Sequence, residues 1–464
     1  MGIVLSGGTI VTAVDCYRAD VRLAGEKIIA IGNDHLAGPG DQVISVDGCY
    51  LLPGAIDPHT HFDMPAGSFT TADDFVSGTA AAVVGGTTTI IDHITQEKGE
   101  SLFNALAKWQ AKAGGKSYTD YGFHMGITDY HGQVPEEMAA LVQQEGLTSF
   151  KLYTAYKRLR VNDGEIFQTL QHCKELGALA CFHCENGDVI DVLIQQAKEQ
   201  GCTGPISHPL TRPSATEQEA TSRVIMLAEL AGTPIYIVHL SCASALQEVV
   251  AAKTRGVEVY AETCPQYLLL DDSCYAGEGF EGAKYVMSPP LRKPRDQAAL
   301  WLGLKTGALD TIGTDHCSFN FKGQKEIGLG DFSKIPGGAP GVEHRLGLLY
   351  TYGVGTGKIS MQQLVAITAT NSAKLFGLYP RKGTLAVGSD ADIVVWDPRP
   401  SYIIRAANQT QRVDYTPFEG WQQQGRAEQV FIRGQQVVDR GKLCPEEPKG
   451  QYLLRKPFQF RSIT

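Results

Sequence analysis

The sequence lacks any long apolar run and any dense cluster of basic residues. No uninterrupted apolar stretch approaches the roughly 18 residues that cross a bilayer. The first six residues lack the basic flank and apolar core of a signal peptide. The formal net charge is -9, and no Lys/Arg run is present to bind a phosphate backbone or an anionic membrane. We therefore expect no nucleic-acid or membrane partner, and a small neutral or polar substrate.

Cysteine shows no disulfide framework either. The 11 cysteines are scattered, and several lie in apolar segments that read as strands or helices. We interpret them as reduced packing residues in a reducing compartment, which predicts a cytoplasmic protein. Cys184 beside His183 and Cys317 beside His316 are not taken as zinc ligands, because neighbours on a strand face opposite ways.

Short β-branched runs separated by turn residues fill both ends of the chain. They occupy the first 54 residues and return at 388–396 and 429–438. A chain of 464 residues with 43% apolar side chains can hold more than one core. We therefore predict one small β-sandwich built from both termini, 1–54 and 379–442, followed by a C-terminal tail at 443–464.

Between these ends, strand-like runs alternate with runs of helical period, which is the pattern of βαβ units. Eight such strands can be counted, and they predict an α/β fold with a (β/α)8 TIM-type barrel at 55–378. The candidate strand ends are His59-Thr60-His61, Ile91-Asp92, Phe123-His124, Phe150-Lys151-Leu152, Phe182-His183, Val238-His239, Ala261-Glu262 and Thr314-Asp315.

Two of the steps between strands are long, and both contain insertions rich in proline and glycine, at 201–213 and 276–294. The active site of such a barrel lies at the C-terminal ends of its strands. The stretch 324–341 is also rich in glycine and proline, and it is predicted to form a long loop over that end.

His59 and His61 are two residues apart on one strand, so their side chains face the same way and can share a metal ion. Taken alone, this pair is equally well explained as a hydrogen-bonded core pair. Four further polar residues at the ends of apolar strands favour the metal site over the core pair: Lys151, His183, His239 and Asp315. Each has an ordinary structural explanation by itself, but together they supply nitrogen and oxygen ligands at the catalytic end of one barrel.

Lys151 lies between Phe150 and Leu152, in a strand that is predicted to be buried. An ammonium group there has a large desolvation cost unless it reaches the rim or is neutralised. Beside four histidines, we expect the neutral amine to add carbon dioxide and to form a carbamate that bridges two divalent cations.

Further motifs accompany these residues along the chain. They are Asp63-Met64-Pro65, Ala72-Asp73-Asp74-Phe75, Gly85-Gly86-Thr87-Thr88, Ser149-Phe150-Lys151-Leu152-Tyr153, Val238-His239-Leu240-Ser241, Glu262-Thr263-Cys264-Pro265-Gln266-Tyr267-Leu268, Ser288-Pro289-Pro290-Leu291-Arg292 and Gly313-Thr314-Asp315-His316-Cys317. With these motifs, nearly the whole chain resembles the cyclic amidohydrolases of the hydantoinase and dihydropyrimidinase type, within the amidohydrolase superfamily.

The resemblance implies hydrolytic ring opening of cyclic ureides, such as 5-substituted hydantoins and dihydropyrimidines, to N-carbamoyl amino acids. It implies two divalent metal ions per subunit, expected to be zinc, with a hydroxide between them. The implied ligands of the first ion are His59, His61, Lys151 and Asp315. Those of the second ion are Lys151, as its carbamate, His183 and His239.

By the same resemblance, Asp315 moves a proton from the attacking water to the leaving nitrogen, and Tyr156 donates a hydrogen bond to the developing oxyanion. Tyr156, Ser288 and Gly337 are the expected substrate-binding residues, the last two through their main chain. Many members of the family carry asparagine where this chain has Gly337, so we expect a freer loop at this position.

The ring substituent is expected to meet a mostly apolar wall. This wall is predicted to consist of Phe62, Met64, Phe69, Tyr153 and Tyr156, which belong to two loops. Its character predicts tolerance of a bulky substituent at position 5 of the ring.

Two alternatives stay open at this point, and a third is disfavoured. Dihydroorotases carry an arginine just after the second histidine, whereas this chain has Phe62-Asp63-Met64, which does not suit a carboxylate substrate. Allantoinase shares the fold and the ligand set and is the first open alternative. The second is a non-catalytic scaffold, because some relatives of this fold have lost their metal ligands.

The C-terminal segment 452–458 is too apolar to remain in solvent. We expect it to dock on a neighbouring subunit. Together with the resemblance, this predicts a homotetramer.

Overall fold

A barrel of eight parallel strands forms the centre of the computed structural model, which describes residues 2–33 and 36–458. Each strand pairs with the next one along the chain, and an isolated parallel bridge between Thr60 and His316 closes the ring. The predicted α/β barrel is therefore confirmed. Its strands are β8 (Ala55–Thr60), β11 (Thr87–Ile94), β12 (Asp120–Gly126), β13 (Ser149–Tyr153), β14 (Leu179–His183), β15 (Ile235–Ile237), β16 (Val259–Thr263) and β17 (Thr311–Ile312).

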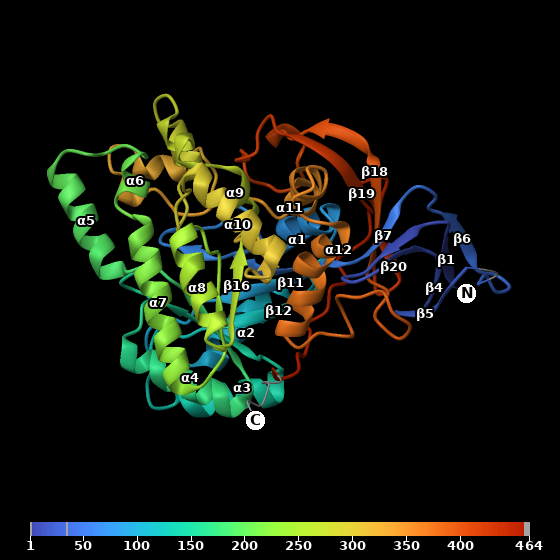
Figure 1. Cartoon of the computed structure of the whole chain (residues 1–464), viewed down its shortest axis with the longest axis horizontal. Helices are drawn as coiled ribbons and strands as arrows, with labels where there is room; N and C mark the ends of the chain where they lie inside the picture. Colours follow the sequence, from blue (N-terminus) through green and yellow to red (C-terminus); the bar gives the residue numbers. More distant parts are fainter. Residues whose placement is uncertain (1, 34–35, 459–464) are drawn as a thin grey trace.

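Helices surround the barrel (Figure 1). The longer ones are α1 (Phe75–Val84), α2 (Leu102–Ala113), α3 (Val134–Glu145), α4 (Asp163–Leu176), α5 (Gly187–Glu199), α7 (Ser214–Ala231), α8 (Ala243–Thr254) and α10 (Pro294–Thr306). The short ones are α6 (Ser207–Leu210), α9 (Pro265–Leu269), α11 (Arg345–Leu349), α12 (Met361–Val365) and α13 (Asn371–Leu375). Two π-helical segments, η5 (Tyr350–Val354) and η6 (Ala366–Thr370), extend α11 and α12. The remaining 3-10 turns are η1 (Asp272–Ala276), η2 (Glu281–Tyr285), η3 (Lys325–Gly328), η4 (Phe332–Lys334) and η7 (Ala406–Asn408).

Local sequence signals set the ends of these helices, as α4 illustrates. The Asn162 side chain accepts a hydrogen bond from the backbone N–H of Glu165, and the Glu165 carboxylate accepts one from the N–H of Asn162, at 3.0 Å and 2.7 Å. This reciprocal pair is a capping box. The helix ends at Gly177, whose φ of 64° suits a left-handed C-cap. Its inner face buries Ile166, Thr169, Leu170 and Cys173.

Both ends of the chain form two further sheets beside the barrel (Figure 1). β18 pairs with β7 in antiparallel orientation, and a buried apolar cluster lies between the sheets, as the predicted sandwich requires. The four-stranded sheet contains β1 (Ile3–Ser6), β4 (Asp20–Ala24), β5 (Lys27–Gly32) and β6 (Gln42–Ser45). The seven-stranded sheet contains β2 (Thr9–Val11), β3 (Cys16–Arg18), β7 (Tyr50–Pro53), β18 (Ile393–Ile403), β19 (Gln422–Ile432), β20 (Gln435–Asp439) and β21 (Lys442–Leu443). A small hairpin, β9 (Pro65–Ala66) and β10 (Phe69–Thr70), follows the first barrel strand.

Part of the C-terminal tail packs on its own barrel. Leu453 is 1% exposed, and its N–H donates to the carbonyl of Tyr121 at 2.8 Å. The buried guanidinium of Arg455 donates to Ser149 Oγ at 2.9 Å. Leu454, between these two residues, is 62% exposed, so docking of the tail on a neighbouring subunit stays a prediction. Residues 459–464 lie outside the described residues. The predicted homotetramer rests mainly on the resemblance.

Seven of the 11 cysteines are buried packing groups, whereas Cys16 and Cys202 are exposed. All 11 are free thiols, as expected. Cys181 and Cys184 stand in Cys-X-X-Cys spacing, but each thiol contacts a backbone carbonyl two residues earlier, at 3.9 Å and 3.8 Å. Burial raises the pKa of both thiols to about 12. Among the described residues, no helix has the length and apolar character needed to cross a membrane.

Candidate metal centre and active site

One cavity of about 970 Å³ lies at the C-terminal ends of the barrel strands. The loop predicted to cover this end contributes 332–333 and 335–338 to its wall. All of the residues assigned from the sequence to metal binding, catalysis or substrate binding line the same cavity: His59, His61, Lys151, Tyr156, His183, His239, Ser288, Asp315 and Gly337. The fold therefore brings the complete predicted set together.

His59 and His61 both direct a ring nitrogen at one carboxylate oxygen. Their Nε2 atoms lie 3.2 Å and 3.1 Å from Oδ1 of Asp315, which follows the last barrel strand. β17 and β8 are neighbours across the closure of the barrel, so residues far apart in sequence meet here. Two imidazoles and a carboxylate around one point form a ligand set that suits a divalent cation.

His183 and His239 form a second group, at the ends of β14 and β15. Nδ1 of His183 lies 2.8 Å from Nε2 of His239, and Nε2 of His183 lies 2.9 Å from the Glu185 carboxylate. Because an ionised carboxylate only accepts hydrogen bonds, Nε2 of His183 carries the ring proton and Nδ1 keeps its lone pair. That lone pair faces His239, so the two rings are oriented to share a cation.

Lys151 is unusual for a lysine, because its amine is buried and, in the described part of the chain, unpartnered. It lies in the middle of β13, is 1% exposed, and its Nζ has no hydrogen-bond partner among the described residues. Burial lowers the pKa of its amine to about 8. A neutral, unpartnered amine is the form that can react with carbon dioxide, so this side chain fits the predicted carbamate.

Buried carboxylates behind the histidines were not assigned a role from the sequence. Oε1 of Glu262 lies 2.6 Å from Nδ1 of His59 and accepts the backbone N–H of His239 at 3.1 Å. Glu185 accepts from His183 and from Arg212, the latter at 2.8 Å. Such partners fix the ring orientation of histidine ligands. The signal for Glu262 was available, because this carboxylate ends an apolar strand.

Three of the six non-glycine residues that the described chain holds at positive φ line this cavity. They are Tyr156 at 67°, His239 at 40° and Asp315 at 51°. Left-handed backbone is unfavourable for such residues, by about 1 kcal/mol or more, and it persists only where surrounding contacts impose it. These backbone conformations therefore lower the stability of the fold, and they direct the three side chains into the cavity.

Tyr156 stands at the mouth of the cavity and is 37% exposed. The guanidinium of Arg212 lies 5.7 Å from the centroid of its ring, and Ser288 lines the same cavity. Desolvation raises the pKa of the hydroxyl well above its ordinary value, although Arg212 opposes this shift. The group is therefore a protonated donor at neutral pH.

The two segments predicted to bind the ring, around Ser288 and Gly337, are held together by a buried lysine that sequence reasoning missed. The three donors of Lys325 Nζ bind the carbonyls of Val286, Pro336 and Gly338, at 2.8, 2.9 and 2.7 Å. The Gly338 N–H also donates to Val286, at 3.0 Å.

Gly337 leaves open space inside this clamp. A Cβ atom added there would meet only Ser288 Oγ, at an ordinary 3.7 Å. The absence of a side chain at this position therefore enlarges the cavity, and it is not required by a close backbone approach.

The predicted apolar wall is correct for three residues and wrong for two. Met64, Tyr153 and Tyr156 line the cavity. Phe62 is fully buried against Phe75, 5.9 Å away between ring centroids, because the residue after His61 faces the opposite side of the chain. Phe69 packs on Phe319, and it is Phe319 that lines the cavity.

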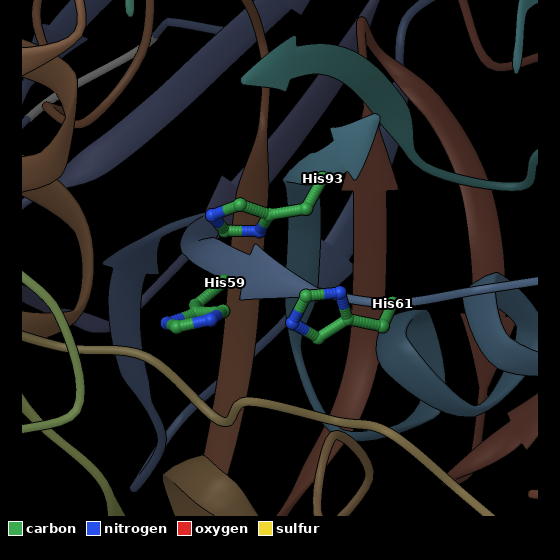
Figure 2. A group of neighbouring side chains, drawn as sticks. All are labelled: His59, His61 and His93. Carbon is green, nitrogen blue, oxygen red and sulfur yellow. The ribbon is translucent and has the colours of Figure 1, made fainter. Parts of the chain in front are cut away.

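The structure also adds a histidine to the centre. His93, in β11, lies with His59 and His61 in a group that could hold a metal ion, and a second group consists of His59, His239 and Asp315. Figure 2 shows the first group gathered at the ends of neighbouring strands. Sequence reasoning ended this strand at Asp92 and passed over the next residue.

Comparison with known proteins gives close matches. Residues 50–437 match the model of the amidohydrolase family. A D-hydantoinase of Geobacillus stearothermophilus is 50% identical over 455 residues, which cover 98% of this chain and 96% of that protein. The crystal structure of dihydropyrimidinase from Brevibacillus agri matches with a TM-score of 0.98 at 50% identity, covering 99% of this chain and all of that one. An L-hydantoinase (dihydropyrimidinase) from Arthrobacter aurescens matches with a TM-score of 0.88 at 28% identity, covering 97% of this chain and 99% of that one.

The likeness extends beyond the barrel. The family match begins at Tyr50 in β7 and ends at Val437 in β20, so it includes strands of the seven-stranded sheet. The Geobacillus and Brevibacillus relatives also span both flanking sheets. By sequence and by structure, the chain belongs to the amidohydrolase family.

Proposed function

We propose that this chain hydrolyses cyclic ureides, namely 5-substituted hydantoins and dihydropyrimidines, to N-carbamoyl amino acids. The observation that carries the proposal is the meeting of four imidazoles, a buried lysine and a carboxylate in one cavity. Opening a ring amide requires addition of water to the carbonyl and protonation of the leaving nitrogen, and this cavity contains groups for both steps. The names of the relatives, D-hydantoinase and dihydropyrimidinase, support this reaction class.

The residues of the cavity fit two divalent cations, which we take to be zinc. His59, His61, Lys151 and Asp315 would hold the first, and Lys151, His183 and His239 would hold the second. The unpartnered Nζ of Lys151 supports this arrangement, because no described residue binds this amine, and as a carbamate it would serve both ions. When bound, the cations polarise the ureide carbonyl and make water more acidic.

Asp315 is the proposed proton carrier. It takes a proton from the attacking water and delivers it to the ring nitrogen as the C–N bond breaks. Its contacts of 3.1 Å and 3.2 Å with His61 and His59 place its carboxylate at the centre of the site. The other carboxylates that line the cavity, Glu97 and Asp191, form ion pairs with basic side chains, Arg158 and Lys157 among them.

Tyr156 is proposed to donate its hydroxyl proton in a hydrogen bond to the oxyanion that forms during ring opening. The Tyr156→Phe variant is expected to lower kcat by about two to three orders of magnitude, the usual scale for one oxyanion donor, while metal content stays unchanged. Steady-state kinetics on a 5-substituted hydantoin, with metal analysis, would measure both. Tyr153→Phe is the matched control, because Tyr153 lines the same cavity. A Tyr156→Phe enzyme as fast as wild type would reduce Tyr156 to a packing residue.

The ureide ring is proposed to bind the main chain at Ser288 and Gly337, with its substituent against Met64 and Phe319. The mostly apolar character of these side chains suits alkyl and aryl groups. We further propose a preference for the D-enantiomer. Support comes from the relatives, because those named D-hydantoinase reach 50% and 44% identity, whereas the L-hydantoinase is 28% identical.

A small substrate panel tests the proposed function. Hydantoin, dihydrouracil, both enantiomers of 5-benzylhydantoin, and allantoin would be compared by the absorbance change on ring opening. We expect the D-benzyl compound to react fastest. Turnover of allantoin alone would establish an allantoinase instead. A folded protein that binds no metal and opens none of these rings would be a scaffold.

The resemblance to the hydantoinase family also bears on the oligomeric state of the chain and on its location in the cell. We propose a cytoplasmic homotetramer. The resemblance supports the tetramer, and the free thiols support the cytoplasmic location. Light scattering at micromolar concentration is expected to give about four times the 50.2 kDa mass of the chain. A monomer under these conditions would contradict the tetramer without affecting the proposed reaction.

A further inference from the structure

His93 is a buried histidine that the proposed reaction does not use. It lies in β11, next to β8, and is fully buried. Neither of its ring nitrogens has a hydrogen-bond partner in the part of the chain that the structure describes. Buried polar groups almost always have partners, so two unpartnered nitrogens on one ring need an explanation.

Three other histidines surround the ring of His93, and their own hydrogen bonds limit which of them can act with it. The centroid of its ring lies 4.4 Å from that of His59, 4.9 Å from that of His61 and 4.6 Å from that of His124. Both ring nitrogens of His124 are already hydrogen-bonded, to a serine hydroxyl and to a backbone carbonyl. Of these three histidines, only His59 and His61 of the first metal site therefore remain as partners for His93, and the unpartnered Nζ of Lys151 belongs to the same centre.

We propose that His93 is an additional ligand of the first metal site and shares its cation with His59 and His61. One ring nitrogen of each residue lies within 4.8 Å of the other two, and Figure 2 shows the three rings facing a common space. Two nitrogens that each lie about 2.1 Å from one zinc ion are at most about 4.2 Å apart, so rings that now stand further apart would have to close toward the cation. The inference rests on the proposed function, because it adds a residue to the same centre.

A third imidazole changes the chemistry of that site. With Lys151 and Asp315 as oxygen donors, the first site would hold more nitrogen than the second, which has His183 and His239. Imidazole is a ligand that suits divalent transition metals such as zinc, copper and nickel. We therefore expect the first site to keep its ion longer than the second against a chelator.

The experiment compares three metal-loaded proteins: wild type, His93→Phe, and His344→Phe as a matched control. His344 is also buried, with one unpartnered ring nitrogen, but it belongs to neither of the described groups that could hold a metal ion. Zinc affinity would be measured by competition with a chelator, and the visible spectrum would be recorded after cobalt substitution. His93→Phe is expected to lose at least about tenfold in affinity at one site, since even outer partners of ligands have that effect. Its cobalt spectrum should change, and that of His344→Phe should not.

A His93→Phe protein with wild-type zinc affinity and an unchanged cobalt spectrum would overturn the inference while leaving the proposed function intact. If wild type itself bound no metal and opened no ring, the proposed function would fail first. Should His93→Phe not fold, a crystal structure of the zinc-loaded wild type decides. A His93 nitrogen about 2.1 Å from the ion supports the inference, and one beyond about 3 Å refutes it.

Discussion

Replacing Lys151 with alanine is expected to abolish ring opening and to remove at least one metal ion from each chain. The alanine leaves no group to bridge His59 and His61, at the end of β8, and the pair formed by His183 and His239. The loss should be much larger than the removal of a positive charge alone would cause, because in the proposed centre two ions would depend on the same side chain.

Metal analysis and kinetics of the Lys151→Ala variant test this expectation. Formate, acetate or propionate should restore part of the activity, because a short carboxylate can occupy the space of the carbamate. Lys157→Ala is the control, since Lys157 lines the cavity with its side chain 73% exposed and contacts none of the metal-binding residues through an ion pair. Full activity in Lys151→Ala would remove the basis of the proposed mechanism.

The Asp315→Asn variant is expected to lose most of its turnover, by about two to four orders of magnitude, the range for a positioned acid–base group. Asparagine has nearly the same size, and its amide oxygen can still face His59 and His61. It cannot accept the proton of the attacking water or return it to the leaving nitrogen. The loss should therefore appear in kcat, with a smaller change in metal content than in Lys151→Ala.

Asp191→Asn provides the comparison for Asp315→Asn. Asp191 also lines the cavity, but it pairs with Lys157 and Arg160 and makes no contact with the histidines. Its substitution should change kcat little. If Asp315→Asn kept more than about a tenth of wild-type kcat, another group would have to carry the proton.

The barrel and the residues at its centre could be predicted because their signals are local. A strand buried on both sides reads as an apolar run, and a polar residue at its C-terminal end stands out against that run. Lys151 is the clearest case, since Phe150 and Leu152 are fully buried on either side of it. The parallel order of the barrel then brings strand ends together without further information.

The features that were not predicted depend on contacts between segments that are far apart in the chain. No local pattern in the sequence indicates such contacts. Lys325 looks like a surface lysine until three carbonyls from two loops are placed around it. Arg455 looks like part of a charged tail, yet it is buried under β12 and β13. His93 was overlooked for the same reason, because its importance comes from His59 and His61 on the neighbouring strand and not from its own surroundings in the sequence.

The metal content of the purified, active protein tests the central claim most directly. Elemental analysis of a preparation that opens a 5-substituted hydantoin should find about two divalent ions per chain, and prolonged dialysis against a chelator should remove activity and metal together. A preparation that stays fully active with no bound metal would contradict the account, because the histidines, Lys151 and Asp315 would then have to act without the cations that their arrangement fits.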